Sequence, residues 1–275
     1  MADPAASFES ALALQPAGDG HLVADIPLGW DVRGNPHGGY LLALVARAMG
    51  RVVAQPHPLS VSASYLAPPR MGPADLFVEI ARAGRRQSTA SVRLVQDGIE
   101  RVRADGTFGE LGREPASPLA DDVVPPPVPP PELCLDTAAL ETAEGEEIRL
   151  HRRLLLRFHP DTGWLRGAPS GVPALHGWMA LADGTAPDPA ALLLFSDGFP
   201  PSMFEAAGRV FGHVPTVQLT THVFGLPAPG WVQGRFRTRV RGGSFVDEDG
   251  ELWDARGQLV ATTRQLALLR PPAPS

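Results

Sequence analysis

Asp197 is a charged residue at the end of an apolar helical pattern, and it is a candidate for acid–base chemistry. It directly follows the run Leu192-Leu-Leu-Phe-Ser196 in the second half of the chain. Burying a carboxylate without partners costs free energy, so its position needs a reason. Asp197 could be a general base if a water lies within hydrogen-bond reach. The alternatives are an Asp on the helix surface or a residue that caps the helix before Gly198.

Gln265 is a second candidate, in a predicted strand over residues 259–269. Side chains alternate along a strand, which places Gln265 on one face with Thr263 and Ala267. A neutral amide offers two donors and an acceptor, which suits holding a water against a carbonyl group. A polar residue that only lines a sheet face is the alternative.

The segment from His37 to Gly39 precedes a predicted helix over residues 40–53 and is a candidate anion site. Glycines let a ligand approach backbone N–H groups, and a helix N-terminus carries partial positive charge. Such donors could receive a developing oxyanion, which is typically worth roughly 10²–10³ in rate. His37 could add a polar contact. Alternatively, the glycines only permit tight packing and His37 lies in a surface loop.

Arginines alternate along another predicted strand, which covers residues 230–240, and would share one face of it. They are Arg235, Arg237, Arg239 and, just beyond, Arg241. Because guanidinium groups bind phosphate bidentately, Arg235 and Arg237 are phosphate-binding candidates, as are Arg85 and Arg86. A solvated, charged sheet face is the alternative.

The composition excludes several kinds of chemistry. All 24 basic residues are Arg, so no lysine can form a Schiff base or complete a phosphate loop of the Gly-Lys-Ser type. The single cysteine, Cys134, rules out a disulfide within the chain and a zinc site built on cysteines. The eight His residues show no metal-ligand spacing, so we expect no metal. A net charge of −6 argues against a nucleic-acid partner.

The chain ends and hydropathy predict a soluble, cytoplasmic protein without membrane insertion. The first 19 residues lack the basic region and apolar run of a signal peptide, and no uninterrupted apolar stretch reaches 18 residues.

A proline-rich run at residues 124–131 divides the chain. Prolines have no backbone N–H to donate, so this run should form an extended connector. We therefore predict an N-terminal unit over residues 1–120, a linker over 121–135 and a C-terminal unit over 136–275.

The two predicted units repeat one order of elements, which suggests a duplication. In the first unit, strands at 22–26, 60–66, 76–83, 88–96 and 99–108 accompany the helix at 40–53. In the second, a helix at 189–208, bent at Pro200-Pro201, accompanies strands at 148–158, 174–179, 216–224, 230–240, 244–254 and 259–269. A helix with antiparallel strands buries itself best when the sheet curves around it. We therefore expect an α+β fold in which two long helices are each wrapped by a curved antiparallel sheet, with both units sharing one continuous sheet.

Short motifs in this order resemble the double hot-dog thioesterases, a superfamily that includes bacterial acyl-CoA thioesterase II. In the first half they are Asn35-Pro-His-Gly-Gly-Tyr-Leu-Leu-Ala-Leu44, Ser64-Tyr-Leu-Ala-Pro68 and Gly84-Arg-Arg-Gln-Ser88. In the second half they are Ser196-Asp197, Thr216 and Thr263-Arg-Gln265. The resemblance covers nearly the whole chain outside the tails and linker, and it implies a tandem hot-dog fold.

The resemblance also implies an activity, the hydrolysis of a fatty or other acyl-CoA by direct attack of water. Asp197, Thr216 and Gln265 align with the family residues that hold and activate this water. His37, Gly38, Gly39 and Tyr40 would bind the substrate and its oxyanion, and the arginine candidates would contact the phosphates of coenzyme A. Coenzyme A enters as part of the substrate, so no separate cofactor is expected.

The chain departs from the thioesterase II pattern at two places. Tyr40 stands where the family has Gln, and Gln218-Leu219 stand where it has an Asp-His pair. Two other functions stay open beside hydrolysis. One is hydration of an enoyl-CoA, although hot-dog hydratases typically pair an Asp with a His a few residues away, and no His follows Asp197 until His213. The other is binding of an acyl-CoA or lipid without turnover. The sequence leaves the oligomeric state open, a homo-oligomer included.

Overall fold

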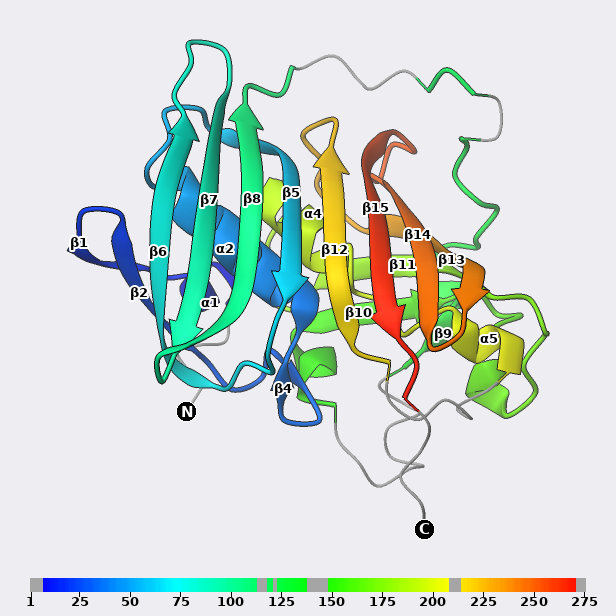
Figure 1. Cartoon of the computed structure of the whole chain (residues 1–275). Coiled ribbons are helices and arrows are strands. Elements are labelled where there is room, and N and C mark those ends of the chain that lie inside the picture. The colour runs from blue at the N-terminus through cyan, green and yellow to red at the C-terminus, as the bar shows by residue number, and fades with distance from the viewer. Residues whose placement is uncertain (1–6, 113–117, 121–122, 138–147, 208–213, 271–275) are drawn as a thin grey trace.

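A computed structural model of the chain describes residues 7–112, 118–120, 123–137, 148–207 and 214–270. Within these residues one large antiparallel sheet dominates, and helices lie behind it in the view of Figure 1. Its thirteen strands follow the order β1-β2-β6-β7-β8-β5-β12-β15-β14-β13-β11-β10-β9. The start of the predicted linker at 121–122 and the predicted helix end at Gly208 lie outside the described residues.

The first unit supplies the strands on one side of this sheet and the longest described helix. Its elements are α1 (Phe8–Ala11), β1 (Gln15–Gly18), β2 (His21–Ile26), the small hairpin β3 (Asp31–Val32) and β4 (Asn35–Pro36), α2 (Gly38–Gly50), β5 (His57–Tyr65), β6 (Gly72–Arg82), β7 (Ser88–Gln96) and β8 (Ile99–Gly109). Asp97 and Gly98 form the turn between β7 and β8, both with positive φ, as the Asp-Gly pair predicts.

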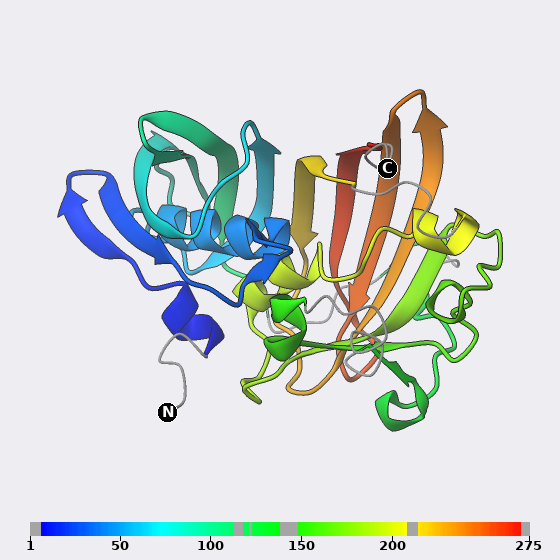
Figure 2. The ribbon, with the colours of Figure 1, turned by 90° about the horizontal axis from the view of Figure 1, so that it is seen from below.

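The α2 helix is apolar on nearly all sides because it is enclosed by protein. All residues from Gly39 to Met49 are buried except Arg47, whose guanidinium pairs with Glu9 near the surface. Figure 2 shows the strands of the first unit curling around this helix. The predicted wrapping of a helix by a curved sheet is thus visible for this unit.

The second unit supplies the other strands. Its elements are η1 (Pro131–Leu133), β9 (Leu135–Asp136), η2 (Arg149–Arg152), β10 (Leu154–Phe158), η3 (Trp164–Arg166), β11 (Ala174–Leu181), α4 (Pro189–Phe195), α5 (Met203–Ala207), β12 (Thr216–Val223), β13 (Val232–Gly242), β14 (Phe245–Trp253) and β15 (Leu259–Leu268). The units join where β5 pairs antiparallel with β12, with Leu219 opposite Ala63. The predicted hot-dog architecture with one continuous sheet is confirmed.

The second helical segment differs from the single bent helix that we expected. Asp188 caps the start of α4 by accepting the N–H of Ala191, and α4 ends at Phe195. The connection from Ser196 to Ser202 is not helical, and α5 begins at Met203. Pro200 and Pro201 lack the N–H donors that a continuous helix would need, so the predicted bend is a complete break.

The proline-rich segment lies extended against the second unit. Its described residues 123–130 form no helix or strand. The carbonyl of Pro126 accepts from Gln233 Nε2 at 2.6 Å, and that of Pro129 accepts from Trp178 Nε1 at 2.8 Å. Side chains of β13 and β11 therefore satisfy carbonyl groups of the linker.

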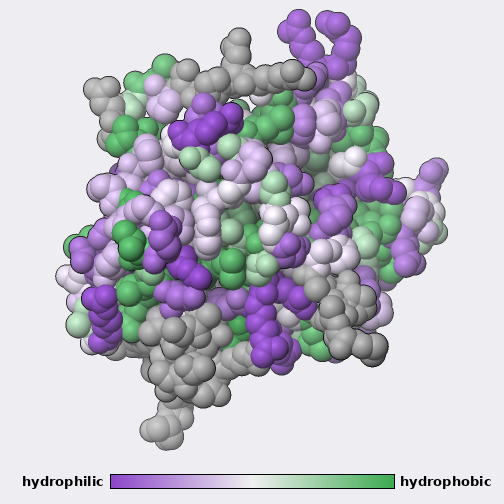
Figure 3. All heavy atoms as spheres, turned by 180° about the vertical axis from the view of Figure 1, so that it is seen from behind, coloured by the Kyte–Doolittle hydropathy of each residue, from purple (hydrophilic) through white to green (hydrophobic). Residues whose placement is uncertain are grey.

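The face opposite the sheet mixes hydrophilic and hydrophobic residues, and some hydrophobic ones are visible near its middle (Figure 3). In the part of the chain that the structure describes, no helix has the length and apolar character needed to cross a membrane.

Candidate active site

The N-terminus of α2 meets the end of α4, so that the two units touch at Asp197. The backbone N–H of Gly39 donates to Asp197 Oδ2 over 3.1 Å. His37 Nε2 lies 2.8 Å from the carbonyl oxygen of Asp197 and 3.4 Å from Oδ2. Because His37 Nδ1 accepts the N–H of Tyr40, Nε2 carries the proton when the ring is neutral and donates it to the Asp197 carbonyl.

His37 is therefore a buried helix cap, with 8% of its surface exposed, rather than a residue of a surface loop. Its ring closes the first turn of α2 on one side and holds the main chain of Asp197 on the other. This position could not be read from the sequence, since 160 residues separate the two partners.

Gly38 and Gly39 allow this contact because a side chain at Gly39 would meet backbone atoms of α4, and one at Gly38 would displace the Asp197 carboxylate. A Cβ on Gly39 would lie 2.3 Å from the carbonyl oxygen of Leu194, and one on Gly38 would lie 2.6 Å from Asp197 Oδ2. Both distances are below any ordinary van der Waals contact. The tight-packing alternative for these glycines thus describes what the structure shows, and the same packing brings the helix N-terminus to the carboxylate.

Gln265 links Asp197 to Thr216 through its side-chain amide. Its Nε2 donates to Asp197 Oδ1 at 2.9 Å and to Thr216 Oγ1. The Asp197 side chain is 15% exposed. Both oxygens of this carboxylate are therefore held, one by the first unit and one by the second, and the three residues predicted to act together lie together.

An irregularity in β12 brings Thr216 to the same face of the sheet as Gln265. Thr216 pairs with Ala267, whereas Gln218 pairs with Leu266, so the register between β12 and β15 shifts between these positions. Leu219, opposite Gln265, is fully buried, and Gln218 is exposed. A bulge of this kind re-aims a side chain. It places Thr216 and Leu219, three residues apart, on the inner face.

Burial is the main influence on the ionisation of Asp197, and it raises the pKa of this carboxyl. His37, the N–H groups of Gly39 and Gly38, and the Gln265 amide act in the opposite direction by stabilising the charged form. A carboxylate with a raised pKa and fixed orientation has the properties of a general base.

Tyr65 is a site residue that sequence reasoning did not single out. It ends β5, and its hydroxyl donates to the Gly38 carbonyl at 2.7 Å. Burial, and then the charge of Asp197, raise the pKa of this hydroxyl. Its place in the Ser64–Pro68 motif was the available signal, but the motif alone does not reveal that Tyr65 reaches the α2 N-terminus.

Tyr40 faces away from these residues. Its side chain is fully buried, stacks on Trp30 and donates its hydroxyl to the Ala11 carbonyl at 2.8 Å. Its backbone N–H is bonded to His37. In this arrangement Tyr40 anchors the N-terminal segment to α2, and substrate binding by Tyr40 stays a prediction.

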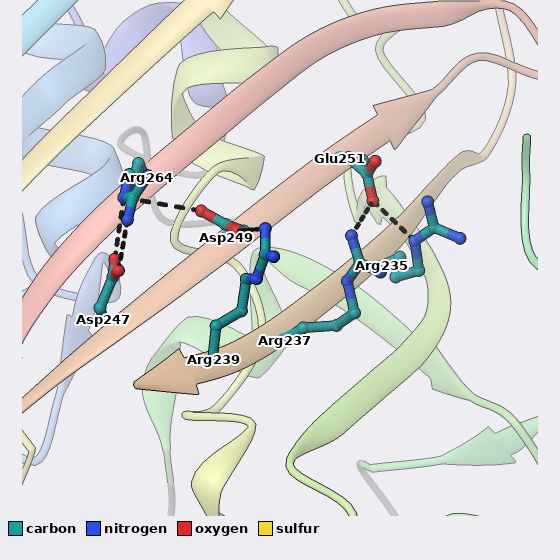
Figure 4. A network of polar contacts seen from close by, with 7 residues as sticks. All are labelled: Arg235, Arg237, Arg239, Asp247, Asp249, Glu251 and Arg264. Atoms are coloured by element: carbon teal, nitrogen blue, oxygen red, sulfur yellow. Dashed lines mark hydrogen bonds and ion pairs between the residues drawn. The ribbon is translucent and has the colours of Figure 1, made fainter. Parts of the chain in front are cut away.

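The arginine row of β13 lies among carboxylates of β14 (Figure 4). Arg235 Nε contacts Glu251 at 2.6 Å, Arg237 contacts the same carboxylate at 3.4 Å, and Arg239 contacts Asp249 at 3.1 Å. Arg264 of β15 pairs with Asp247. These guanidinium groups already have anionic partners, which fits the charged sheet face better than a phosphate site. Arg85 and Arg86 are exposed residues of the β6–β7 turn.

Both halves of the chain match models of one protein family. The model of the acyl-CoA thioesterase N-terminal domain matches residues 26–109, and that of the C-terminal domain matches residues 120–269. Uncharacterized proteins of Mycobacterium tuberculosis and Mycobacterium bovis are 32% identical over 270 residues, covering 87% of this chain and 88% of theirs.

Solved structures share the same architecture over almost the whole chain. A candidate thioesterase II from Thermobifida fusca has a TM-score of 0.86 and 27% identity, over 97% of this chain and 98% of its own. A hot-dog protein of unknown function from Alicyclobacillus acidocaldarius has a TM-score of 0.83 and 23% identity, over the same shares. The acyl-CoA thioesterase II TesB2 from Mycobacterium marinum has a TM-score of 0.74 and 18% identity, over 97% of this chain and 99% of its own.

Proposed function

Because this chain belongs to the acyl-CoA thioesterase family and is a thioester hydrolase, we propose that it cleaves its acyl-CoA by direct attack of a water molecule that Asp197 activates. The observation that carries this proposal is the bridge from Gln265 Nε2 to both Asp197 Oδ1 and Thr216 Oγ1. The bridge holds a carboxylate, a hydroxyl and an amide close together. A water molecule beside them would find hydrogen-bond acceptors as well as a donor.

In the proposed reaction Asp197 acts as general base. Its carboxylate accepts a proton as the water oxygen bonds to the thioester carbon, which leaves a tetrahedral oxyanion. The oxyanion then collapses, the C–S bond breaks and coenzyme A leaves as a thiolate, which takes up the proton from Asp197 or from solvent. The products are a free acid and coenzyme A.

The oxyanion would lie near the N-terminus of α2, where the helix dipole favours negative charge. In the structure the Gly39 N–H donates to Asp197 Oδ2. When Asp197 gains the proton, its hold on this N–H weakens, and the donor becomes available to an oxyanion formed beside it. The same groups would then stabilise negative charge first on the base and later on the substrate.

Hydration of an enoyl-CoA is a second candidate, which one observation favours. His37 and Asp197 approach within 3.4 Å although they come from different units, so an Asp and a His do share the site. However, both His37 nitrogens already have partners, Tyr40 N–H and the Asp197 carbonyl. A cap held in this way is poorly placed to transfer protons, so we rank hydrolysis first.

A screen of saturated acyl-CoA esters of graded chain length, with thiol release as the readout, tests the proposal. We expect catalytic release for at least one chain length. Crotonyl-CoA followed at its enoyl absorbance tests the alternative in the same preparation. Binding without thiol release for every ester, or hydration without hydrolysis, would contradict the proposal.

A further inference from the structure

Glu248 is a buried carboxylate beside the proposed active site that the reaction above does not use. It lies on the inner face of β14, with 7% of its surface exposed. It pairs across β14 and β15 with Gln265, and across β13 and β14 with Thr238. Directly paired residues of antiparallel strands have Cβ atoms about 4.5–5.5 Å apart, so Glu248 is the immediate neighbour of Gln265.

Three donors converge on one oxygen of this carboxylate. Glu248 Oε2 accepts the backbone N–H of Ser202 at 2.7 Å, the Ser202 hydroxyl, and the Thr238 hydroxyl at 3.4 Å. Ser202 is fully buried, and its Oγ also accepts the N–H of Thr238 at 2.8 Å. Glu248 therefore ties the beginning of α5 to two strands of the sheet.

The hydrogen bonds between Glu248 and Ser202 restrain the segment that carries Asp197. Asp197 and Ser202 are five positions apart, and Pro200-Pro201 lie between them with restricted backbone angles. At the other end, Asp197 N–H donates to the Leu194 carbonyl at 3.3 Å. Phe199, in the middle, packs against Phe158 and Phe236. Fixing Ser202 thus restrains a short connection that contains the proposed base, Asp197.

We propose that Glu248 is a positioning residue for thioester hydrolysis: by anchoring Ser202 it holds the connection between α4 and α5, and with it Asp197, against Gln265. The inference rests on the function proposed above. The carboxylates of Glu248 and Asp197 also influence each other through their charges. Burial is the main cause that raises the pKa of Glu248 to about 7, and the charge of Asp197 adds to it, against the opposing effect of the Ser202 bonds.

The first experiment measures hydrogen exchange of the backbone amides at residues 196–199 and 202–204 in the wild type, Glu248→Ala and Glu248→Gln. Gln keeps an oxygen acceptor for Ser202 and Ala does not. We expect the Ser202 amide to exchange roughly ten-fold faster in Glu248→Ala, because a hydrogen bond to a charged group is lost, and close to the wild-type rate in Glu248→Gln. No substrate is needed, so this result is independent of the proposed function.

The second experiment measures kcat and KM for the acyl-CoA that the wild type hydrolyses best. Misplacing a reacting group by about 1 Å can cost roughly 10²-fold in rate, so we expect kcat of Glu248→Ala to fall by about 10- to 100-fold with KM nearly unchanged. Glu248→Gln should restore most of kcat. Asp247→Asn, a neighbouring carboxylate on the outer face of the same strand, is the matched control and should leave both constants unchanged.

Ser202→Ala provides a second route to the same contact if Glu248→Ala does not fold, because it removes the hydroxyl and keeps the backbone N–H. It should lower kcat less than Glu248→Ala does. Wild-type exchange at Ser202 in Glu248→Ala, or a folded Glu248→Ala with wild-type kcat, would overturn the proposal. So would equal losses in the Ala and Gln variants. Absence of hydrolysis by the wild type would instead refute the proposed function. The hydrogen-exchange result would then still test whether Glu248 anchors Ser202.

Discussion

Asp197 Oδ2 in the second unit accepts the backbone N–H of Gly39 in the first unit at 3.1 Å. One carboxylate is thereby shared between the two halves of the chain, since its other oxygen accepts from Gln265. A site built in this way needs both units in their observed arrangement, and neither half contains it alone.

Substituting Gly39 by Ala should disrupt this junction. The new Cβ would lie 2.3 Å from the Leu194 carbonyl oxygen, a backbone atom that cannot move without shifting α4. We expect a loss of stability of about 1–3 kcal/mol, as for other overpacked sites, and a kcat at least ten-fold lower. Urea unfolding and thiol release measure the two effects. Gly242→Ala is the control, because a Cβ there meets nothing within 4 Å; equal behaviour of the two variants would refute the packing argument.

Gln265 and Asp197 should be energetically coupled in catalysis. Gln265→Ala removes the donor to Asp197 Oδ1 and to Thr216 Oγ1, so we expect kcat to fall by roughly 10²-fold, as for loss of an oriented polar group. In a double-mutant cycle with Asp197→Asn, the combined loss should be clearly smaller than the product of the single losses. Strictly multiplicative losses would show that the two side chains act independently.

The arginine row should contribute to the stability of the sheet rather than to recognition of coenzyme A. Arg237 is held by Glu251 over 3.4 Å, and Arg235 holds the same carboxylate. We therefore expect Arg237→Gln to change KM for an acyl-CoA by less than about two-fold, with a stability loss within the roughly 0–1 kcal/mol typical of partly exposed pairs. A comparison with an acyl-pantetheine thioester, which lacks the nucleotide phosphates, sharpens the measurement. A several-fold rise in KM for the acyl-CoA alone would assign Arg237 to phosphate binding.

The sequence was sufficient to predict most of the long strands and α2 because their patterns are local. The short strands β1 and β9 were not predicted, and the first part of the strand predicted at 148–158 is the 3-10 helix η2. The strand over residues 88–96 and the Asp97-Gly98 turn follow from alternation and turn chemistry within a few residues. The face of Gln265 followed from the same alternation. The double hot-dog family was predicted from the order of short motifs, and the fold confirms it.

Contacts between distant residues could not be predicted in the same way. Whether Arg235 pairs with Glu251 depends on the register of β13 and β14, which the pattern within either strand leaves open. The pattern over residues 189–208 predicts one helix with a bend, whereas α4 ends at Phe195 and α5 begins at Met203, because Pro200 and Pro201 lack the N–H donors of a continuous helix. Tyr65 and Glu248 look like ordinary strand residues until the partners Gly38 and Ser202 are placed beside them.

Stability should depend on pH through Glu248 in a direction unusual for a carboxyl group. Folding raises its pKa from 4.5 to about 7, so between these values the folded chain binds more protons than the unfolded one. Its contribution to stability therefore decreases as the pH rises from about 4.5 to about 7, and it is constant above that. His151 and His176, whose pKa values burial lowers to about 4, act in the opposite direction between about 4 and 6.5.

The variant Glu248→Gln isolates this contribution, because the histidines are common to both proteins. The free energy of unfolding of Glu248→Gln minus that of the wild type should increase from pH 4.5 to pH 7 and then level off. Denaturant unfolding at five or six pH values gives this difference. A difference that stays constant would mean that Glu248 titrates normally in the folded protein, and one that decreases would mean that folding lowers its pKa; either would contradict the prediction.

Asp197→Asn separates general-base catalysis by this carboxylate from a structural role. The substitution keeps the size of the side chain and removes its charge and basicity. With kcat, KM and melting temperature measured on one preparation, we predict a fall in kcat of roughly 10²–10⁴-fold, as for a lost general base. KM should change little. The melting temperature should hold or rise, because burial already disfavours the charged form of Asp197. A folded Asp197→Asn variant that hydrolyses acyl-CoA at the wild-type rate would show that Asp197 is not the general base.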